Sequence, residues 1–243
     1  MKIHILETPP LLGEAAGSRA ASLIEAAIRS RNEANIILAT GSSQFATLRQ
    51  LIGSSLDWSR VRMFHLDEYI GLPESHPASF RKYLRERFIN LVPPLMDYYL
   101  INGEAADPVS ECERLDTLID KYPIDVALIG IGENGHLAFN DPPADFTTED
   151  AFHVVQLDQA CRQQQVGEGW FSSWESVPAT AISMSIPQIM ASKALIVSVP
   201  DSRKAHAVKC TVHGLVDPDC PASILQNHPD CELFLDLNAA VLL

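Results

Sequence analysis

Short hydrophobic runs alternate along the chain with amphipathic stretches in which apolar residues recur every three to four positions. The apolar runs predict strands over 35–40, 61–66, 98–101, 125–131, 179–185, 194–199 and 232–237. The amphipathic stretches predict helices over 16–29, 44–51, 78–91, 110–121 and 202–212. This alternation implies crossover connections and predicts an α/β fold: a doubly wound, mostly parallel sheet flanked by helices on both faces.

The chain shows no repeat, low-complexity tract or linker-like run, so we expect one domain over residues 1–243. In such folds ligands gather beyond the carboxyl ends of the strands. The polar residues that follow each predicted strand are therefore the candidates for a functional site.

Composition narrows the function classes. A net charge of −13 without a basic stripe argues against nucleic-acid binding. No apolar run approaches the ~20 residues needed to cross a bilayer, and the start MKIHILETPP lacks the features of a signal peptide. Five cysteines without a C-x-x-C pair favour a reduced, cytoplasmic protein over a disulfide framework.

Residues 126–142 read VALIGIGENGHLAFNDP, where a predicted strand runs into a glycine-rich turn. The glycines fit the spacing G-x-G-x-x-G, but a dinucleotide site also needs a helix opening at the third glycine. Two prolines at 142 and 143 argue against that helix. The turn instead delivers His136 beside Asp141, a carboxylate that could orient the imidazole for proton transfer. A histidine satisfied by backbone carbonyls is the structural alternative.

Two other strand ends carry candidate chemistry. Gly41, Ser42 and Ser43 connect a strand to a helix, where backbone amides and hydroxyls can hold an anion or simply cap the helix. Asp67 and Glu68 follow the strand at 61–66 and point to opposite sides, so only one is expected to face a given pocket. That one is a candidate base, and a turn role is the alternative. A metal site built from His65, Asp67 and His76 has no recognised ligand spacing.

Two basic residues complete the set. Arg162 lies in a polar stretch with little helical amphipathicity, and Lys204 lies where a strand turns into a helix. Cations are poorly placed at a helix N-terminus, so they suggest an anionic ligand, with solvated surface charge as the alternative.

Five segments together carry a family resemblance: LATGSSQFATLRQLI, FHLDEYIGLPESHPASFRKYL, GIGENGHLAFNDP, VPDSRKAHAVKCTVHG and CPASILQNHPDCELFLD. In this order they resemble the glucosamine-6-phosphate deaminase family, also called glucosamine-6-phosphate isomerase. The 6-phosphogluconolactonases share its fold, but they typically continue after the histidine with a serine-leucine-phenylalanine-proline type of sequence. The Leu-Ala-Phe-Asn-Asp that follows His136 is similar to the deaminase branch.

The resemblance implies a role for each candidate. Phosphate would rest on the turn at 41–43 with charge from Arg162 and Lys204, and Glu68 would also belong to the substrate site. His136 would protonate the ring oxygen and open the sugar. Asp67 would move the C2 proton to C1, and hydrolysis of the resulting imine would release ammonia and fructose 6-phosphate. This chemistry needs no cofactor and no obligatory metal. The implied partner is a small amino-sugar phosphate, and a homo-oligomer stays open because relatives include monomers and larger assemblies.

The chain also departs from the family pattern. Many members carry Asp two residues before the histidine and Glu five residues after it, where this chain has Asn134 and Asp141. Asn134 can orient the ring only by hydrogen bonding, and the shorter Asp141 predicts a looser contact. The segment 145–178 differs from the best-known members around Arg162. Residues 147–155 lack the basic residues of an allosteric site, so we expect no strong activation by N-acetylglucosamine 6-phosphate.

Two further hypotheses compete with the deaminase. One is a sugar-lactone hydrolase like the 6-phosphogluconolactonases. The other is a non-catalytic sugar-phosphate sensor, which is disfavoured because the chain has no DNA-binding segment and has both Asp67 and His136.

Overall fold

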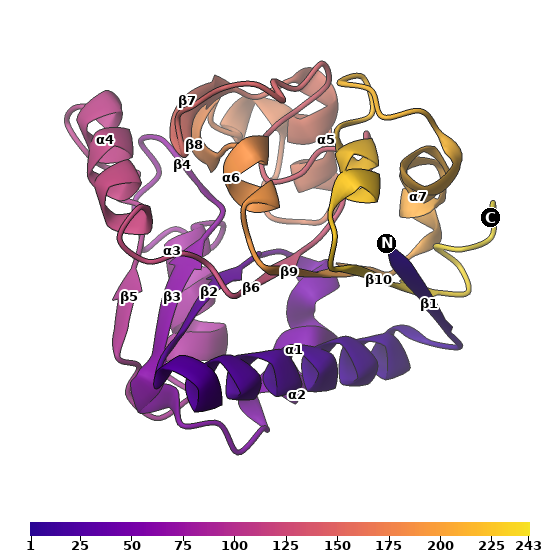
Figure 1. Cartoon of the computed structure of the whole chain (residues 1–243). Coiled ribbons are helices and arrows are strands. Elements are labelled where there is room, and N and C mark those ends of the chain that lie inside the picture. The colour runs from indigo at the N-terminus through magenta and orange to yellow at the C-terminus, as the bar shows by residue number, and fades with distance from the viewer.

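The computed structural model describes residues 1–243, and a seven-stranded sheet with parallel pairing throughout forms its centre. The strand order is β1-β10-β9-β6-β2-β3-β5 (Figure 1). The strands are β1 (Lys2–Leu6), β2 (Ala34–Leu38), β3 (Val61–His65), β5 (Asp97–Tyr99), β6 (Val126–Ile129), β9 (Ala194–Val199) and β10 (Cys231–Asp236). From β2 the chain proceeds outward to β3 and β5, and from β6 it proceeds the other way to β9 and β10. The winding therefore reverses between β2 and β6, and this switch point is where such sheets bind ligands.

Helices cover both faces of this sheet, as predicted. Their bounds are α1 (Pro9–Arg31), α2 (Phe45–Ile52), α3 (Phe80–Leu84), α4 (Pro108–Ile119), α5 (Gln159–Gly167), α6 (Ile186–Met190) and α7 (Ala205–His213). In Figure 1, α1 and α2 lie below the sheet, whereas α4, α6 and α7 lie above it. Successive side chains of a strand point to opposite faces of the sheet, so the sheet has a hydrophobic core on each face. Ile36 and Leu38 pack in one core cluster, and Ile37 and Ala39 pack in the other.

A second sheet, which the sequence did not predict, has three antiparallel strands in the order β4-β8-β7. These are β4 (Asp67–Tyr69), β7 (Phe152–Gln156) and β8 (Thr180–Met184). The chain leaves β3, passes Leu66, whose carbonyl accepts from the Met184 N–H at 2.7 Å, and enters β4 at once. Asp67 thus begins a strand of the small sheet, immediately after the carboxyl end of β3.

All seven predicted strands exist, but five elements were missed: β1, β4, β7, α5 and α6. Most of these five elements are short. The three strands among them form by pairing with segments far away in the sequence, which a local pattern does not reveal. The predicted helix over 78–91 is shorter: α3 starts at Phe80 and continues as a π-helical turn over Arg85–Ile89. The first helix begins seven residues earlier than expected, at Pro9, because Thr8 caps it through the Leu11 N–H.

The sequence favoured a reduced protein over a disulfide framework, and the structure pairs only two of the five cysteines. Cys210 and Cys220 form a disulfide, while the other three cysteines are free and buried. The two paired residues are ten positions apart and share no local motif. They meet because α7 packs against the 3₁₀-helical segment Pro221–Asn227, an arrangement that hydrophobic periodicity does not specify.

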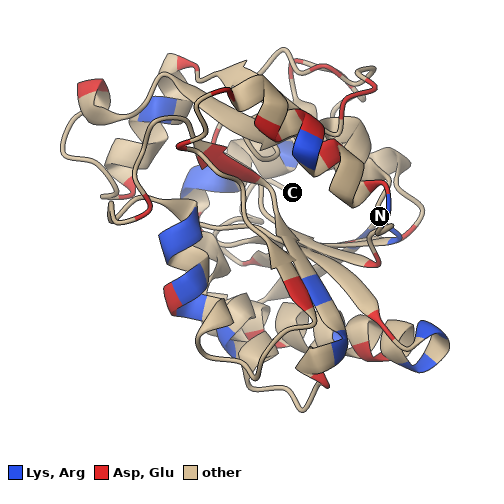
Figure 2. Cartoon of the chain, turned by 90° about the vertical axis from the view of Figure 1, so that its left-hand side faces the viewer, with Lys and Arg blue, Asp and Glu red and all other residues tan.

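The structure contains no helix that is both long and apolar enough to cross a membrane. On the side drawn in Figure 2, Lys and Arg positions are interleaved with Asp and Glu positions along the helices.

Candidate functional site

A polar pocket opens at the switch point, beyond the carboxyl ends of β2 and β6. It combines residues from six separate parts of the chain. Its lining consists of Ala39, Thr40, Gly41, Ser43, Leu66, Asp67, Phe80, Gly130, Ile131, Gly132, His136, Ala138, Phe139, Gln164, Gln165, Glu168 and Lys204. Five sequence candidates line it directly: Gly41, Ser43, Asp67, His136 and Lys204.

The turn after β2 forms one end of the pocket. Gly41 has φ +99°, a backbone conformation that side-chain-bearing residues rarely adopt, and it leads into the 3₁₀ turn Ser42–Gln44. The Tyr83 hydroxyl donates to the Gly41 carbonyl at 2.9 Å, and the buried Gln44 amide donates to the Ser198 carbonyl at 3.3 Å. Ser42 is exposed at the rim. The turn is thus held from both sides, with its amides and the Ser43 hydroxyl next to the pocket.

Asp67 is the buried carboxyl of the pocket. It is 7% exposed and no hydrogen bond from the protein reaches its side chain. Burial, followed by the negative charge of Glu68, raises the pKa of Asp67 to about 8. A desolvated carboxyl with free lone pairs beside a cavity is suited to accept a proton from a bound molecule.

Glu68, which was expected in the substrate site, points away from this pocket. Its carboxylate accepts from the Ser79 hydroxyl at 2.9 Å and from the Arg81 N–H and guanidinium at 2.9 and 3.1 Å. It is fully buried and outside the pocket lining. The alternation of side chains along β4 separates the two carboxylates. Glu68 therefore anchors the start of α3 and acts on Asp67 only through its charge.

His136 emerges from a tight turn after β6. The Gly132 N–H donates to the His136 carbonyl at 2.9 Å, and the Asn134 side chain accepts from the His136 N–H at 3.1 Å. The imidazole lies flat against Gly132, where a Cβ atom would come within 2.3 Å of the ring. The glycine that resembled part of a nucleotide motif is thus needed because the histidine ring takes the space of a side chain.

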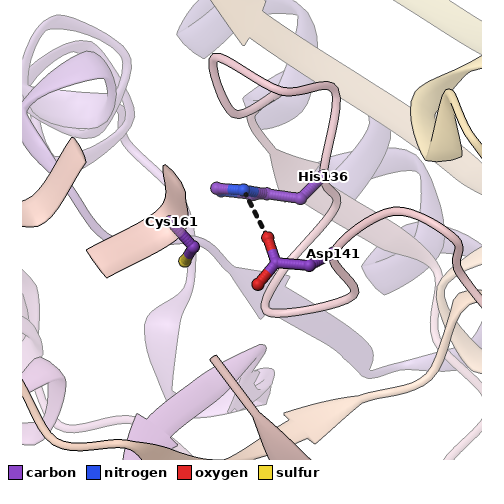
Figure 3. Close-up of side chains that lie close together, drawn as sticks. All are labelled: His136, Asp141 and Cys161. Carbon is purple, nitrogen blue, oxygen red and sulfur yellow. Dashed lines mark ion pairs between the residues drawn. The ribbon is translucent and has the colours of Figure 1, made fainter. Parts of the chain in front are cut away.

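Asp141 lies beside the imidazole of His136, with one carboxylate oxygen directed toward the ring (Figure 3). Its Oδ1 lies 3.3 Å from His136 Nδ1, an ion-pair contact whose direction is too poor for a well-formed hydrogen bond. The Asn134 amide donates to the same oxygen at 3.0 Å, and the Asp158 N–H donates to Oδ2 at 3.2 Å. Burial raises the pKa of Asp141, but His136 and these donors together lower it below its usual value. Asn134 therefore orients both the backbone and the carboxylate around His136 without adding charge.

Cys161 of α5 completes a small cluster with His136 and Asp141, whose ligand atoms lie within 4.8 Å of one another (Figure 3). Burial and the nearby carboxylates, Asp141 first, raise the thiol pKa of Cys161 well above its ordinary value. A neutral thiol is a weak metal ligand, because metals bind the thiolate. His65, which was considered as a metal ligand in the sequence, instead makes a backbone contact: its Nε2 accepts from the Ile101 N–H at 2.8 Å.

Lys204 provides the buried cation. It is 5% exposed, and this burial lowers its pKa. Its neighbour Arg203 is exposed and pairs with Asp201 at 3.0 Å and Glu133 at 3.3 Å. Of the two cations at this turn, only Lys204 lines the pocket.

Arg162 does not reach the pocket. Its guanidinium donates to the carbonyls of Trp174 and Val177 at 2.9 and 2.8 Å and stacks over the Trp174 ring. The structure therefore provides no pocket contact for the prediction that Arg162 supplies charge to a bound phosphate. Its role is to tie α5 to the segment before β8.

Instead, α5 and the residue after it contribute three pocket residues that the sequence did not suggest: Gln164, Gln165 and Glu168. Asp158 caps the start of the helix, because its carboxylate accepts from the Cys161 N–H. Trp170 and Phe171 follow, and Phe171 is buried in a core cluster with Tyr69 and Phe139. The polar composition of residues 159–168 could have signalled a pocket wall, because a surface helix normally shows a clear apolar stripe.

Comparison with known proteins agrees with this architecture. The family model for glucosamine-6-phosphate isomerases/6-phosphogluconolactonase matches residues 7–233. The chain belongs to this family.

Within the glucosamine-6-phosphate isomerase/6-phosphogluconolactonase family, the chain is similar to proteins named glucosamine-6-phosphate deaminase. A glucosamine-6-phosphate deaminase from Listeria monocytogenes is 38% identical over 94% of this chain and 96% of its own. One from Streptococcus suis is 41% identical over 84% and 85%. The structure of a monomeric glucosamine-6-phosphate deaminase superimposes over the full length of both chains, with a TM-score of 0.92 and 33% identity. These similarities confirm the family resemblance found in the sequence.

Lactonases of the same family share the fold at lower similarity. The 6-phosphogluconolactonase of Trypanosoma brucei matches 99% of this chain with a TM-score of 0.82 but only 19% identity. At this identity the match shows a common architecture and nothing about the reaction.

Proposed function

We propose that this protein is a glucosamine-6-phosphate deaminase, which converts glucosamine 6-phosphate and water to fructose 6-phosphate and ammonia. The observation that carries the proposal is the arrangement of one pocket: an unpartnered buried carboxyl (Asp67) and an imidazole (His136) line it together with a buried cation (Lys204) and the Gly41 turn. The similarity to named deaminases over nearly the whole chain supports it.

The phosphate of the substrate would bind at the turn, where backbone amides, the Ser43 hydroxyl and Lys204 favour an anion. That contact would hold the sugar with its reacting carbons toward Asp67 and His136. Fixing the substrate in this way converts the proton transfers into intramolecular steps.

His136 would donate a proton to the ring oxygen as the C1–O5 bond breaks and take one from the C1 hydroxyl, which leaves an open-chain aldehyde. Asp141 would stabilise the imidazolium that carries this proton, since its carboxylate lies 3.3 Å from Nδ1. Asp67 in its ionised form would then remove the C2 proton while the His136 imidazolium protonates O1, and the Asp67 carboxyl would return its proton to C1. The result is a protonated 2-imino ketose, in which water replaces the nitrogen and releases ammonia.

The test is a product assay. Purified protein is incubated with glucosamine 6-phosphate, and ammonia and fructose 6-phosphate are measured in parallel. Equal amounts of both support the proposal. Hydrolysis of 6-phosphogluconolactone without ammonia release would instead assign a lactonase, and binding without turnover would assign a sensor.

The matched variants are Asp67→Asn in the pocket and Asp120→Asn, which removes an exposed carboxylate at the end of α4. Deamination should fall by about 100-fold or more in the first, because a positioned base contributes roughly 10²–10⁴-fold. It should be unchanged in the second. Full activity of Asp67→Asn would refute the assignment of Asp67 as the base.

A further inference from the structure

The anion-binding end of the pocket already contains an anion, the carboxylate of Glu168. Its Oε1 lies 3.9 Å from Lys204 Nζ, and its Oε2 accepts from the Ser42 hydroxyl at 3.4 Å. The same Oε2 would lie 3.9 Å from a Cβ atom built on Gly41. Glu168 therefore contacts the lysine and the turn that are proposed to receive the phosphate.

Glu168 is held there by its own segment. The Gln164 amide donates to Oε1 at 2.8 Å, and the Trp170 indole N–H donates to Oε2 at 3.2 Å. Its side chain is only 9% exposed. Burial of a carboxylate is costly unless hydrogen bonds and opposite charge compensate it, and Lys204 supplies the opposite charge here.

Glu168 and a phosphate cannot occupy this end of the pocket together. Two anions at contact distance from one lysine repel each other, and the repulsion is strong where water is scarce. The free space in the pocket is about 80 Å³, well below the roughly 300 Å³ of small ligand sites. Displacement of the Glu168 carboxylate from Lys204 would enlarge this end of the pocket for a phosphate.

We propose that Glu168 is a specificity-determining residue that occupies the phosphate subsite of the empty protein and must be displaced by the phosphate of the substrate. The inference rests on the proposed function, because that function identifies the subsite. A phosphate monoester carries a charge of about −1.5 to −2 and three acceptor oxygens, so it outcompetes a carboxylate for Lys204 and the turn. A singly charged or unphosphorylated sugar lacks that advantage, so the internal carboxylate excludes it.

The test measures binding of inorganic phosphate to the full-length protein by titration calorimetry, which requires no catalysis. Glu168→Gln keeps the size of the side chain and removes the charge. We expect the Kd for phosphate to fall by about tenfold, in line with the loss of one charge-assisted contact that phosphate must break. Glu168→Asp keeps the charge on a shorter side chain and should show a smaller decrease in Kd.

Glu133→Gln is the matched control. It removes an equal charge near Lys204, but Glu133 pairs with Arg203 outside the pocket lining. The Kd of the Glu133→Gln variant for phosphate should stay within twofold of the wild-type value. An equal effect in this variant would show that general electrostatics, and not occupation of the subsite, controls binding.

Tryptophan fluorescence gives a second readout. Displacement of Glu168 breaks its hydrogen bond with Trp170, so phosphate should change the emission of the wild type and not that of Trp170→Phe. A Kd in Glu168→Gln that equals or exceeds the wild-type value overturns the inference, as does failure of phosphate to bind any of these proteins. Tighter phosphate binding by Glu168→Gln in a protein that releases no ammonia would uphold this inference while refuting the deaminase.

Discussion

Replacing Asp67 with asparagine should stabilise the protein at alkaline pH while it removes catalysis. The carboxyl is buried without a hydrogen-bond donor from the protein, and its neighbour Glu68 is a buried acid. Such a group resists ionisation, which is the state in which a base must act. Function and stability therefore make opposite demands on this side chain.

The pKa of Asp67 determines the size of the effect. Burial and the charge of Glu68 raise it from 3.8 to about 8 in the folded protein. Between these values the folded state keeps a proton that the unfolded chain has released, so the free energy of unfolding falls by about 1.4 kcal/mol per pH unit. The contribution is fully present below pH 3.8 and is lost as the pH rises through about 8. Over roughly four pH units the upper limit is on the order of 5 kcal/mol, and water in the open pocket reduces it.

The assay is urea denaturation of the wild type, Asp67→Asn and the surface control Asp120→Asn at pH 5, 7 and 9. The neutral amide does not ionise, so the stability advantage of Asp67→Asn should grow by a few kcal/mol from pH 5 to pH 9. The control should follow the wild type. A difference between Asp67→Asn and wild type that is the same at pH 5 and pH 9 would refute the raised pKa. In the wild type, kcat/KM for glucosamine 6-phosphate should correspondingly rise with pH up to about 8, as Asp67 ionises.

Three further changes probe the rest of the site. Gly132→Ala places a Cβ atom 2.3 Å from the His136 ring and should displace the ring, so kcat should fall by about 100-fold or more. A folded variant with wild-type kcat would contradict this position of the ring. Lys204→Ala should raise the KM for glucosamine 6-phosphate by about tenfold or more, because Lys204 lines the pocket. Arg162→Ala should mainly lower the Tm, because Arg162 holds two backbone carbonyls outside the pocket. The opposite result in steady-state kinetics and thermal melts would identify Arg162 as the phosphate ligand. N-acetylglucosamine 6-phosphate should leave the apparent KM within twofold, because residues 147–155 contain no lysine or arginine, and a large decrease would reveal an activating site.

Local patterns predicted the main sheet because its strands are buried on both faces and flanked by long amphipathic helices. They failed for β4, whose three residues pair only with β8, more than a hundred positions later. They also failed for α5, whose polar residues face the pocket and therefore lack the apolar stripe of an ordinary surface helix. Elements that depend on distant partners or on a cavity leave little local signal.

The same division separates the site residues. Gly41, Asp67, His136 and Lys204 meet in one pocket because each follows a strand of a parallel sheet, and the carboxyl ends of such strands meet at one edge. Glu68 and Arg162 lie outside that pocket because their partners come from α3 and from the segment before β8, which local sequence patterns do not place near them.

By itself, then, the sequence determined the fold class, the family and the strand ends that line the pocket, since these depend on residue type and short-range periodicity. Only the tertiary structure decided which of two adjacent carboxylates faces the pocket, that Arg162 lies outside it, and that Glu168 contacts the place proposed for the phosphate. Those outcomes depend on side-chain direction and on contacts between segments far apart in the chain, and neither is encoded in local spacing.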